Sequence, residues 1–236
     1  MTIEFWLLLF GAYLLGSVPS AHLVARWTRG IDLRQYGSGN VGAANIMTVV
    51  SKWWGGVVVV YDVVKGFVPV YIAQVVGLEL VPQIAIGLAA ISGHNWPIFL
   101  GFNGGRGFLT IVGVGLVLAP KLILIALAFS LFLGLLHQLA VGSIVALVAL
   151  PVCTYFFPGA FGVVSQPITL SLGFVAVFIV TVIRRLAGRR AAIAASVLTG
   201  QLMVNRLFFD RDIRDRNAWI HRTPEATTRK FPEQKT

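Results

Sequence analysis

The stretch from Leu122 to Ile183 contains no Asp, Glu, Lys or Arg residue. Because a spanning helix needs about 20 apolar residues, this stretch is long enough for more than one membrane crossing. The whole chain has 57% hydrophobic and only 12% charged residues, whereas soluble domains have roughly 25% charged residues. The sequence therefore predicts an all-α integral membrane protein with several crossings.

The apolar runs predict about seven transmembrane helices, some of them short. We expect them near residues 3 to 25, 54 to 77, 81 to 100, 108 to 119, 122 to 136, 139 to 157 and 168 to 183. The two runs between Phe108 and Leu136 are short for full spans, and Pro120 could instead mark a bend. Five full crossings with partial ones is the alternative. The first run has no basic segment before it and no convincing cleavage site, so we expect a retained helix.

The positions of the basic residues predict the orientation. They follow the first, third and last apolar runs, at Arg26, Arg29, Arg34 and Lys52, at Arg106, and at Arg184, Arg185, Arg189 and Arg190. The positive-inside rule places these segments in the cytoplasm, which puts the N-terminus outside and the C-terminus inside. We expect a single membrane domain over residues 1–190 and a basic, mixed-charge cytoplasmic tail over residues 191–236.

Two glycine-rich polar segments lie among the apolar runs, on the face predicted to be cytoplasmic. They read Gly37-Ser38-Gly39-Asn40-Val41-Gly42-Ala43-Ala44-Asn45 and Asn103-Gly104-Gly105-Arg106-Gly107. Small residues leave backbone N–H groups free to face an anion, and Arg106 adds a fixed positive charge. Together the two segments predict a phosphate site at a membrane face.

Polar residues inside or beside apolar runs are costly unless they are paired or face a cavity. Asp62 and Lys65 have i, i+3 spacing, which places them on one helix face. They form either an internal ion pair or part of a binding site. His94 is followed by Asn95 and then by the second glycine-rich segment. His94 could donate to a phosphate or move a proton, or it could make a structural hydrogen bond.

Several other classes of site are not expected. There is no His, Cys, Asp and Glu cluster at ligand spacing, so we expect no metal and no cofactor, and the single Cys153 excludes an internal disulfide. The sequence lacks both Gly-x-x-x-x-Gly-Lys-Ser/Thr and Gly-x-Ser-x-Gly. The net charge of +10 is typical of attraction to anionic membrane lipids. We do not expect nucleic-acid binding in a chain that is mostly embedded in the membrane.

The order of these motifs resembles one family, the acyl-phosphate-dependent glycerol-3-phosphate acyltransferases of the PlsY type. The matching segments run from about Gly11 to Gly115 and keep the family's order and spacing. They are Gly16-Ser17-Val18-Pro19-Ser20, Asp32-Leu33-Arg34, Gly37 to Ala43 with Asn45, Asp62-Val63-Val64-Lys65-Gly66, Gly93-His94-Asn95-Trp96-Pro97 and Gly104-Gly105-Arg106-Gly107.

The resemblance implies a helical membrane enzyme of phospholipid synthesis that needs no metal. Such an enzyme moves a fatty acyl group from acyl phosphate to glycerol 3-phosphate, giving lysophosphatidic acid and phosphate. It implies a multi-pass protein of the cell membrane (inner or plasma membrane) with a cytoplasmic active site. The expected partners are acyl phosphate, glycerol 3-phosphate and membrane lipids.

The resemblance and the chemistry together predict the site residues. We expect Ser38, His94 and Asn45 to be catalytic. The residues expected to bind substrate or phosphate are Gly37, Gly39, Asn40, Lys65, Asn95, Gly104, Gly105, Arg106 and Gly107. Arg106 and Lys65 would hold phosphate, whereas Ser38, Asn40 and Asn45 would orient the substrates by hydrogen bonds.

The chain departs from the family pattern at three positions of these motifs. Ala44 lacks a hydroxyl group, and Thr48 and Asn103 stand where the family has a cation. The family's third motif has no clear counterpart, although Arg184-Arg185 or Asn205-Arg206-Leu207 could occupy its place. One alternative is therefore a divergent, non-catalytic member that binds a phosphorylated lipid or regulates a partner. Another is a small transporter, although the chain lacks the internal repeat that many transporters show.

Overall fold

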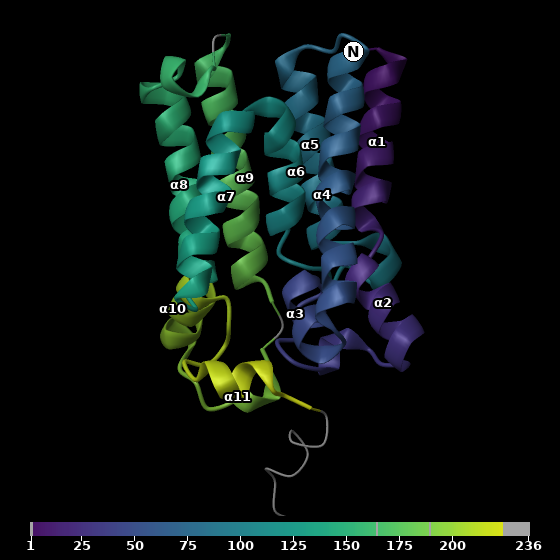
Figure 1. The fold of residues 1–236 in the computed structure, drawn as a ribbon, viewed down its shortest axis with the longest axis vertical. Coiled ribbons are helices and arrows are strands. Elements are labelled where there is room, and N and C mark those ends of the chain that lie inside the picture. The colour runs from purple at the N-terminus through teal and green to yellow at the C-terminus, as the bar shows by residue number, and fades with distance from the viewer. Residues whose placement is uncertain (1, 164, 189, 224–236) are drawn as a thin grey trace, which may run out of the picture.

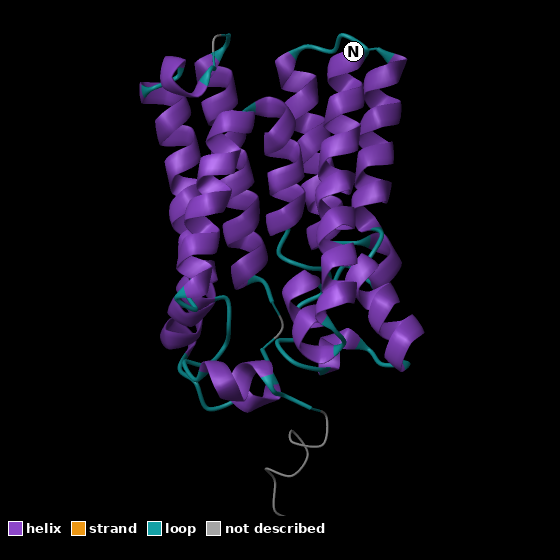
Figure 2. Cartoon of the chain, viewed as in Figure 1, coloured by secondary structure: helices purple, strands orange, loops and turns teal. Residues whose placement is uncertain are grey.

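The computed structural model describes residues 2–163, 165–188 and 190–223. Throughout these ranges every regular element is a helix (Figure 2). The last part of the tail predicted over residues 191–236, from residue 224 onward, lies outside the described residues, and so does Arg189. The prediction of an all-α fold agrees with the described part of the chain.

Long apolar helices run side by side through the molecule (Figure 1). They are α1 (Ile3–Ser17), α4 (Lys52–Val75), α5 (Leu80–Asn95), α6 (Phe108–Leu118), α7 (Pro120–Leu135), α8 (Leu139–Phe156) and α9 (Pro167–Leu186). Four apolar segments in the described ranges are long enough for a full span: Ile3–Arg29, Lys52–Val75, Leu139–Phe156 and Pro167–Leu186. The number of crossings and the orientation of the termini stay predictions.

Two of the predicted spans are interrupted by proline. The helix expected over residues 3 to 25 breaks at Pro19, and α2 (Ser20–Arg29) begins directly after it. A proline inside a helix loses one backbone hydrogen bond and clashes with the preceding turn, and Val18 is accordingly extended, with ψ 114°. The span expected over residues 81 to 100 ends at Asn95, just before Pro97, and a 3₁₀ turn (Ile98–Leu100) follows.

Small residues let the long helices of the N-terminal half approach closely. A side chain on Gly93 of α5 would collide with the carbonyl oxygen of Tyr13 on α1, and one on Gly113 of α6 would collide with the carbonyl oxygen of Val63 on α4. Backbones that pack this closely are typical of helix contacts in membranes. The first contact joins α1 to α5, and the second joins α4 to α6. Because α4 also packs against α1 and α5, these four helices form one group, and α7, α8 and α9 form a second group beside it (Figure 1).

The outward faces of the long helices carry exposed apolar side chains. Leu7 and Phe10 on α1 are 68% and 63% exposed, and Leu135 on α7 is 80% exposed. Such surfaces would be a liability in water, but they suit contact with lipid tails. The described surface therefore fits a chain that spans a membrane.

The short elements gather at one end of the long helices, away from the N-terminus (Figure 1). They are α2, α3 (Ala43–Val49), α10 (Thr199–Phe209), α11 (Arg216–Ile220) and the 3₁₀ turn Leu33–Gln35. Both glycine-rich segments lie towards this end, because one precedes α3 and the other links α5 to α6. The fold therefore brings together the two segments that the sequence assigns to one phosphate site.

Candidate active site

A buried ion pair lies on α4, one helical turn apart. Lys65 Nζ is 2.8 Å from Asp62 Oδ1, and each residue is 1% exposed. The Ser20 hydroxyl also donates to Asp62 Oδ1, at 2.9 Å, and Lys65 Nζ donates to the carbonyl oxygen of Val18 at 3.4 Å. The break at Pro19 thus supplies polar partners to both members of the pair.

A small cavity opens beside this pair, where residues from five segments of the chain meet. Its lining is made of Gly16, Val18, Pro19, Ser20, Val41, Lys65, His94, Pro97, Gly104 and Gly105. Four residues that we predicted to belong to the site, Lys65, His94, Gly104 and Gly105, therefore lie around one space. Lys65 is both a member of the internal ion pair and a lining residue, so the two readings of its role are compatible.

His94 points its imidazole towards the second glycine-rich segment. A side chain on Gly105 would collide with His94 Nε2, which shows how closely the ring and the loop are packed. On its other side, His94 Nδ1 is 3.8 Å from Asp62 Oδ1, a distance too long for a hydrogen bond. Asn95 is fully buried, and its amide atoms have no hydrogen-bond partner among the described residues.

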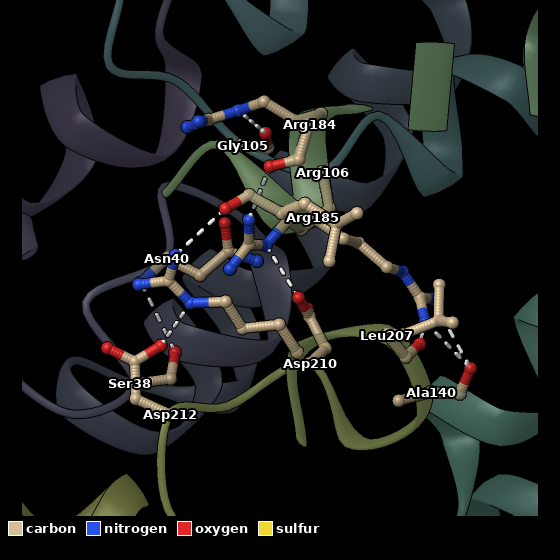
Figure 3. Close-up of polar contacts among 12 residues, drawn as sticks. Ser38, Asn40, Gly105, Arg106, Ala140, Arg184, Arg185, Leu207, Asp210 and Asp212 are labelled. Carbon is tan, nitrogen blue, oxygen red and sulfur yellow. Dashed lines mark hydrogen bonds and ion pairs between the residues drawn. The ribbon is translucent and has the colours of Figure 1, made fainter. Parts of the chain in front are cut away.

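The backbone of the second glycine-rich segment is held from both sides. The N–H groups of Gly104 and Gly105 donate to the carbonyl oxygens of Asn95 and His94, at 3.3 and 3.1 Å. Arg184, at the end of α9, donates in turn to the carbonyl oxygens of Gly105 and Gly104, at 2.9 and 2.6 Å (Figure 3). The loop is therefore fixed by helices from both halves of the molecule.

The first glycine-rich segment is organised by Asn45. Its Oδ1 accepts a hydrogen bond from the Ser38 N–H at 3.0 Å, and its Nδ2 donates to the carbonyl oxygens of Tyr36 and Asn40, at 3.1 and 3.0 Å. The Ser38 hydroxyl accepts from the Asn40 N–H at 3.3 Å. The side chain of Asn45, which we predicted to be catalytic, is thus bonded to the backbone of its own loop.

This arrangement makes Asn45→Ala a test of how much the loop depends on one side chain. The change leaves several loop backbone groups without partners, and each such loss costs about 1–3 kcal/mol where the group is buried. We expect a lower unfolding temperature and weaker substrate binding, measured by thermal unfolding in detergent and by titration with glycerol 3-phosphate. Asn103→Ala is the matched control, because the Asn103 side chain makes a single hydrogen bond within the described residues, to the carbonyl oxygen of Gly101 two residues before it, at 3.1 Å. Equal effects of the two changes would contradict this role of Asn45.

The C-terminal segment contacts both glycine-rich segments. Arg106 Nε is 2.7 Å from Asp210 Oδ1, and Arg106 Nη1 donates to the carbonyl oxygen of Arg184 at 2.9 Å (Figure 3). Arg222 Nε donates to the carbonyl oxygen of Gly37 at 2.8 Å, and the Gly37 N–H donates back to the carbonyl oxygen of Arg222 at 2.9 Å. Burial lowers the pKa of Arg222 to about 10, so it remains a cation at neutral pH.

These contacts were not predicted from the sequence. The dense run of alternating charges from Asp210 to Arg216 was a signal that the tail carries counter-charges, but it does not indicate which residues they meet. At Thr48, where the chain departs from the family pattern, the side chain bonds within its own helix. The Thr48 hydroxyl donates to the carbonyl oxygen of Ala44 at 3.1 Å. Because threonine is uncharged, this position supplies no cation.

Comparisons with known proteins identify the family of this chain. The family model described as glycerol-3-phosphate acyltransferase matches residues 6–195. A glycerol-3-phosphate acyltransferase of Dehalococcoides mccartyi is 45% identical over 96% of this chain and 97% of its own length. One of Prochlorococcus marinus is 40% identical over 66% of this chain and 79% of its own length.

A solved structure extends the similarity to the fold. It is the glycerol 3-phosphate form of PlsY (YgiH), an integral membrane glycerol 3-phosphate acyltransferase, with a TM-score of 0.71 and 29% sequence identity. The match covers 89% of this chain and 95% of that protein. The predicted multi-pass helical membrane fold and the family resemblance are both confirmed. The chain belongs to the glycerol-3-phosphate acyltransferase family, among its PlsY-type members.

Proposed function

We propose that this protein transfers a fatty acyl group from acyl phosphate to the hydroxyl group of glycerol 3-phosphate, at the cytoplasmic face of the cell membrane. The products are lysophosphatidic acid and inorganic phosphate. The observation that carries the proposal is the cavity in which Lys65, His94 and the Gly104-Gly105 turn meet. The relatives that are 40% and 45% identical to the chain are named as acyltransferases, which favours an enzyme over a non-catalytic member or a transporter.

The reaction requires three contributions from the active site. The site must align the two substrates, stabilise the oxyanion that develops on the carbonyl oxygen, and neutralise the charge of the phosphate that leaves. The glycerol hydroxyl oxygen bonds to the acyl carbon, and the bond between that carbon and the phosphate oxygen breaks. Because acyl phosphate is already activated, no covalent intermediate with the protein is needed. The hydroxyl proton passes to His94 or to a substrate phosphate.

The charged residues around the cavity fit these tasks. Lys65 presents its ammonium group at the cavity wall, and Arg106 follows the Gly104-Gly105 turn directly. Both are cations that can bind phosphate oxygens. His94 lies between Lys65 and the turn, where its Nε2 can position the attacking hydroxyl. Ser38 and Asn40 would orient the acceptor from the first glycine-rich segment.

An apolar pocket marks a place where the acyl chain would pack between the helices. It lies between α5, α6 and α9 and is lined by apolar residues such as Ile91, Val114 and Phe174. Ile91 stands one helical turn before the polar cavity residue His94 on α5. A fatty chain placed there would keep its methylene groups out of water, at about 0.8 kcal/mol for each buried group.

The test is product formation by the purified protein in detergent, with acyl phosphate and acyl-CoA compared as donors. We expect lysophosphatidic acid from acyl phosphate, and we expect Arg106→Ala to lower the rate by about 10- to 100-fold, since a hydrogen bond to a charged group contributes about 1.5–3 kcal/mol. Lys121→Ala is the control, because Lys121 lies in the first turn of α7 beside Gly162 of the connection between α8 and α9, outside the candidate site. Product from acyl-CoA alone, or an unchanged rate in Arg106→Ala, would contradict the proposal.

A further inference from the structure

A second arginine lies beside Arg106, and it comes from the C-terminal segment. Arg206 is on α10. Its Cζ is 3.9 Å from the position that a Cβ atom would occupy if Gly188 had a side chain. Arg106 Nη1 and Nη2 are 3.7 and 3.9 Å from the same point. Two guanidinium groups that meet over one glycine repel each other unless anions lie close to both.

Both arginines have donor atoms left over after their contacts within the protein. Arg206 is 4% exposed, its Nε is 2.7 Å from Asp212 Oδ1, and its Nη1 donates to the carbonyl oxygen of Leu186 at 2.8 Å. Its Nη2 is buried and has no hydrogen-bond partner among the described residues. Arg106 Nε is paired with Asp210 by distance, but the N–H group is not aligned for a hydrogen bond. A buried donor without an acceptor is destabilising, so Arg206 Nη2 is a candidate donor to a bound group.

The local charge balance also leaves room for an anion. Arg106 pairs with Asp210, and Arg206 pairs with Asp212. Figure 3 shows the guanidinium groups of Arg184 and Arg185 directed instead to carbonyl oxygens of Gly105, Leu207 and Ala140. The four arginines therefore outnumber the two aspartates that pair with them. Arg184 and Arg185 are committed to backbone carbonyl oxygens of the two helix groups. Arg185 Nε is also buried without a hydrogen-bond partner among the described residues, but Arg106 and Arg206 are the two arginines that approach the same point over Gly188. An added, doubly charged group at that point would contact both.

We propose that Arg206 binds the phosphate group of the substrate together with Arg106. The inference rests on the proposed function and adds a residue to its phosphate site. Thr48 and Asn103 stand where the resemblance places cations, and Arg206 supplies a cation from another part of the chain. Arg206 lies beyond residues 6–195, which the family model matches, in a segment within the similarity to the Dehalococcoides mccartyi relative, which covers 96% of this chain. Phosphate oxygens accept from Arg206 Nη2 and from Arg106, in place of the Asp210 carboxylate.

The test measures binding directly, by calorimetric titration of the purified full-length protein with glycerol 3-phosphate and with inorganic phosphate. We expect Arg206→Gln to weaken both by about tenfold or more, because it removes a charge-assisted hydrogen bond. Arg206→Lys keeps the charge without the planar fork and is expected to fall between Arg206→Gln and the wild type. Arg214→Gln removes the same charge from an exposed position of the same segment and should leave binding unchanged.

A second variant separates binding from a merely structural role. Asp212→Asn breaks the ion pair with Arg206 but keeps the cation, so we expect phosphate to bind as tightly as in the wild type or more tightly. If Arg206 only anchors the C-terminal segment, Asp212→Asn and Arg206→Gln will weaken binding equally, which overturns the inference. Wild-type affinity in Arg206→Gln overturns it as well.

Two further arms identify the ligand and separate this inference from the proposed function. If Arg206→Gln loses retention on phosphatidylcholine vesicles containing phosphatidic acid but binds glycerol 3-phosphate normally, the ligand is a lipid headgroup and the inference is overturned. Phosphate binding that depends on Arg206 in a protein that forms no lysophosphatidic acid would support the inference and reject the proposed function. Full turnover in Arg206→Gln with normal phosphate binding would support the proposed function and overturn the inference.

Discussion

Replacing Gly105 with alanine is expected to lower the rate of acyl transfer by about 100-fold, the loss that a misplacement of roughly 1 Å can cause at a catalytic site. The new methyl group would collide with His94 Nε2 and would lie 2.7 Å from the carbonyl oxygen of Val41. The turn would have to move away from His94, and Arg106 would move with it. The measurement is the initial rate of lysophosphatidic acid formation.

Gly56→Ala is the matched control for this change. Gly56 lies inside α4, and a side chain there would meet nothing within 4 Å. The same substitution in open space should leave the rate unchanged and stabilise the helix slightly, because alanine favours helices by up to about 1 kcal/mol over glycine. A folded Gly105→Ala protein with the wild-type rate would show that the packing of His94 against the turn does not matter for catalysis.

Lys65→Ala is expected to lower the free energy of unfolding by about 3–5 kcal/mol, the usual cost of removing one partner from a buried ion pair. The carboxylate of Asp62 would be left at 1% exposure with the Ser20 hydroxyl as its remaining hydrogen-bond donor. The measurement is the unfolding transition of the purified protein in detergent. Lys52→Ala, at an exposed position, should change stability by no more than about 0.5 kcal/mol.

The double variant Asp62→Asn with Lys65→Met separates stability from function. It removes both charges, and replacing a buried ion pair with neutral groups is often close to neutral for stability. We expect most of the lost stability to return while acyl transfer stays low, because the cation at the cavity wall is still missing. Full activity in the double variant would mean that Lys65 serves packing alone.

Much of the fold could be predicted because a lipid environment demands long apolar helices. Each predicted run corresponds to a helix, and the errors occur where proline intervenes. The helix ending at Ser17 and the one ending at Asn95 both stop just before a proline, at Pro19 and Pro97. Run length alone misses these breaks, and the presence of proline does not identify them either, because Pro69 and Pro151 lie inside α4 and α8 without ending those helices. The break at Pro19 matters for function because it exposes the polar groups that contact Asp62 and Lys65.

The candidate site was partly predictable for a similar reason. Polar residues that lie among apolar runs must pair with one another or face a cavity. Lys65, His94 and the Gly104-Gly105 turn were therefore expected to meet, and they line one cavity. Contacts of the C-terminal segment could not be predicted in this way. A charged residue such as Arg206 has many possible partners in a polar segment, and only the folded chain shows which of them it meets.

The most direct test of the acyl transfer account is the stoichiometry of the reaction. Lysophosphatidic acid and inorganic phosphate should be counted together while the purified protein consumes acyl phosphate in the presence of glycerol 3-phosphate. The account predicts one phosphate released for each lysophosphatidic acid formed, and no phosphate release beyond the spontaneous rate when glycerol 3-phosphate is left out. Phosphate release without lysophosphatidic acid, or neither product from folded protein, would contradict it.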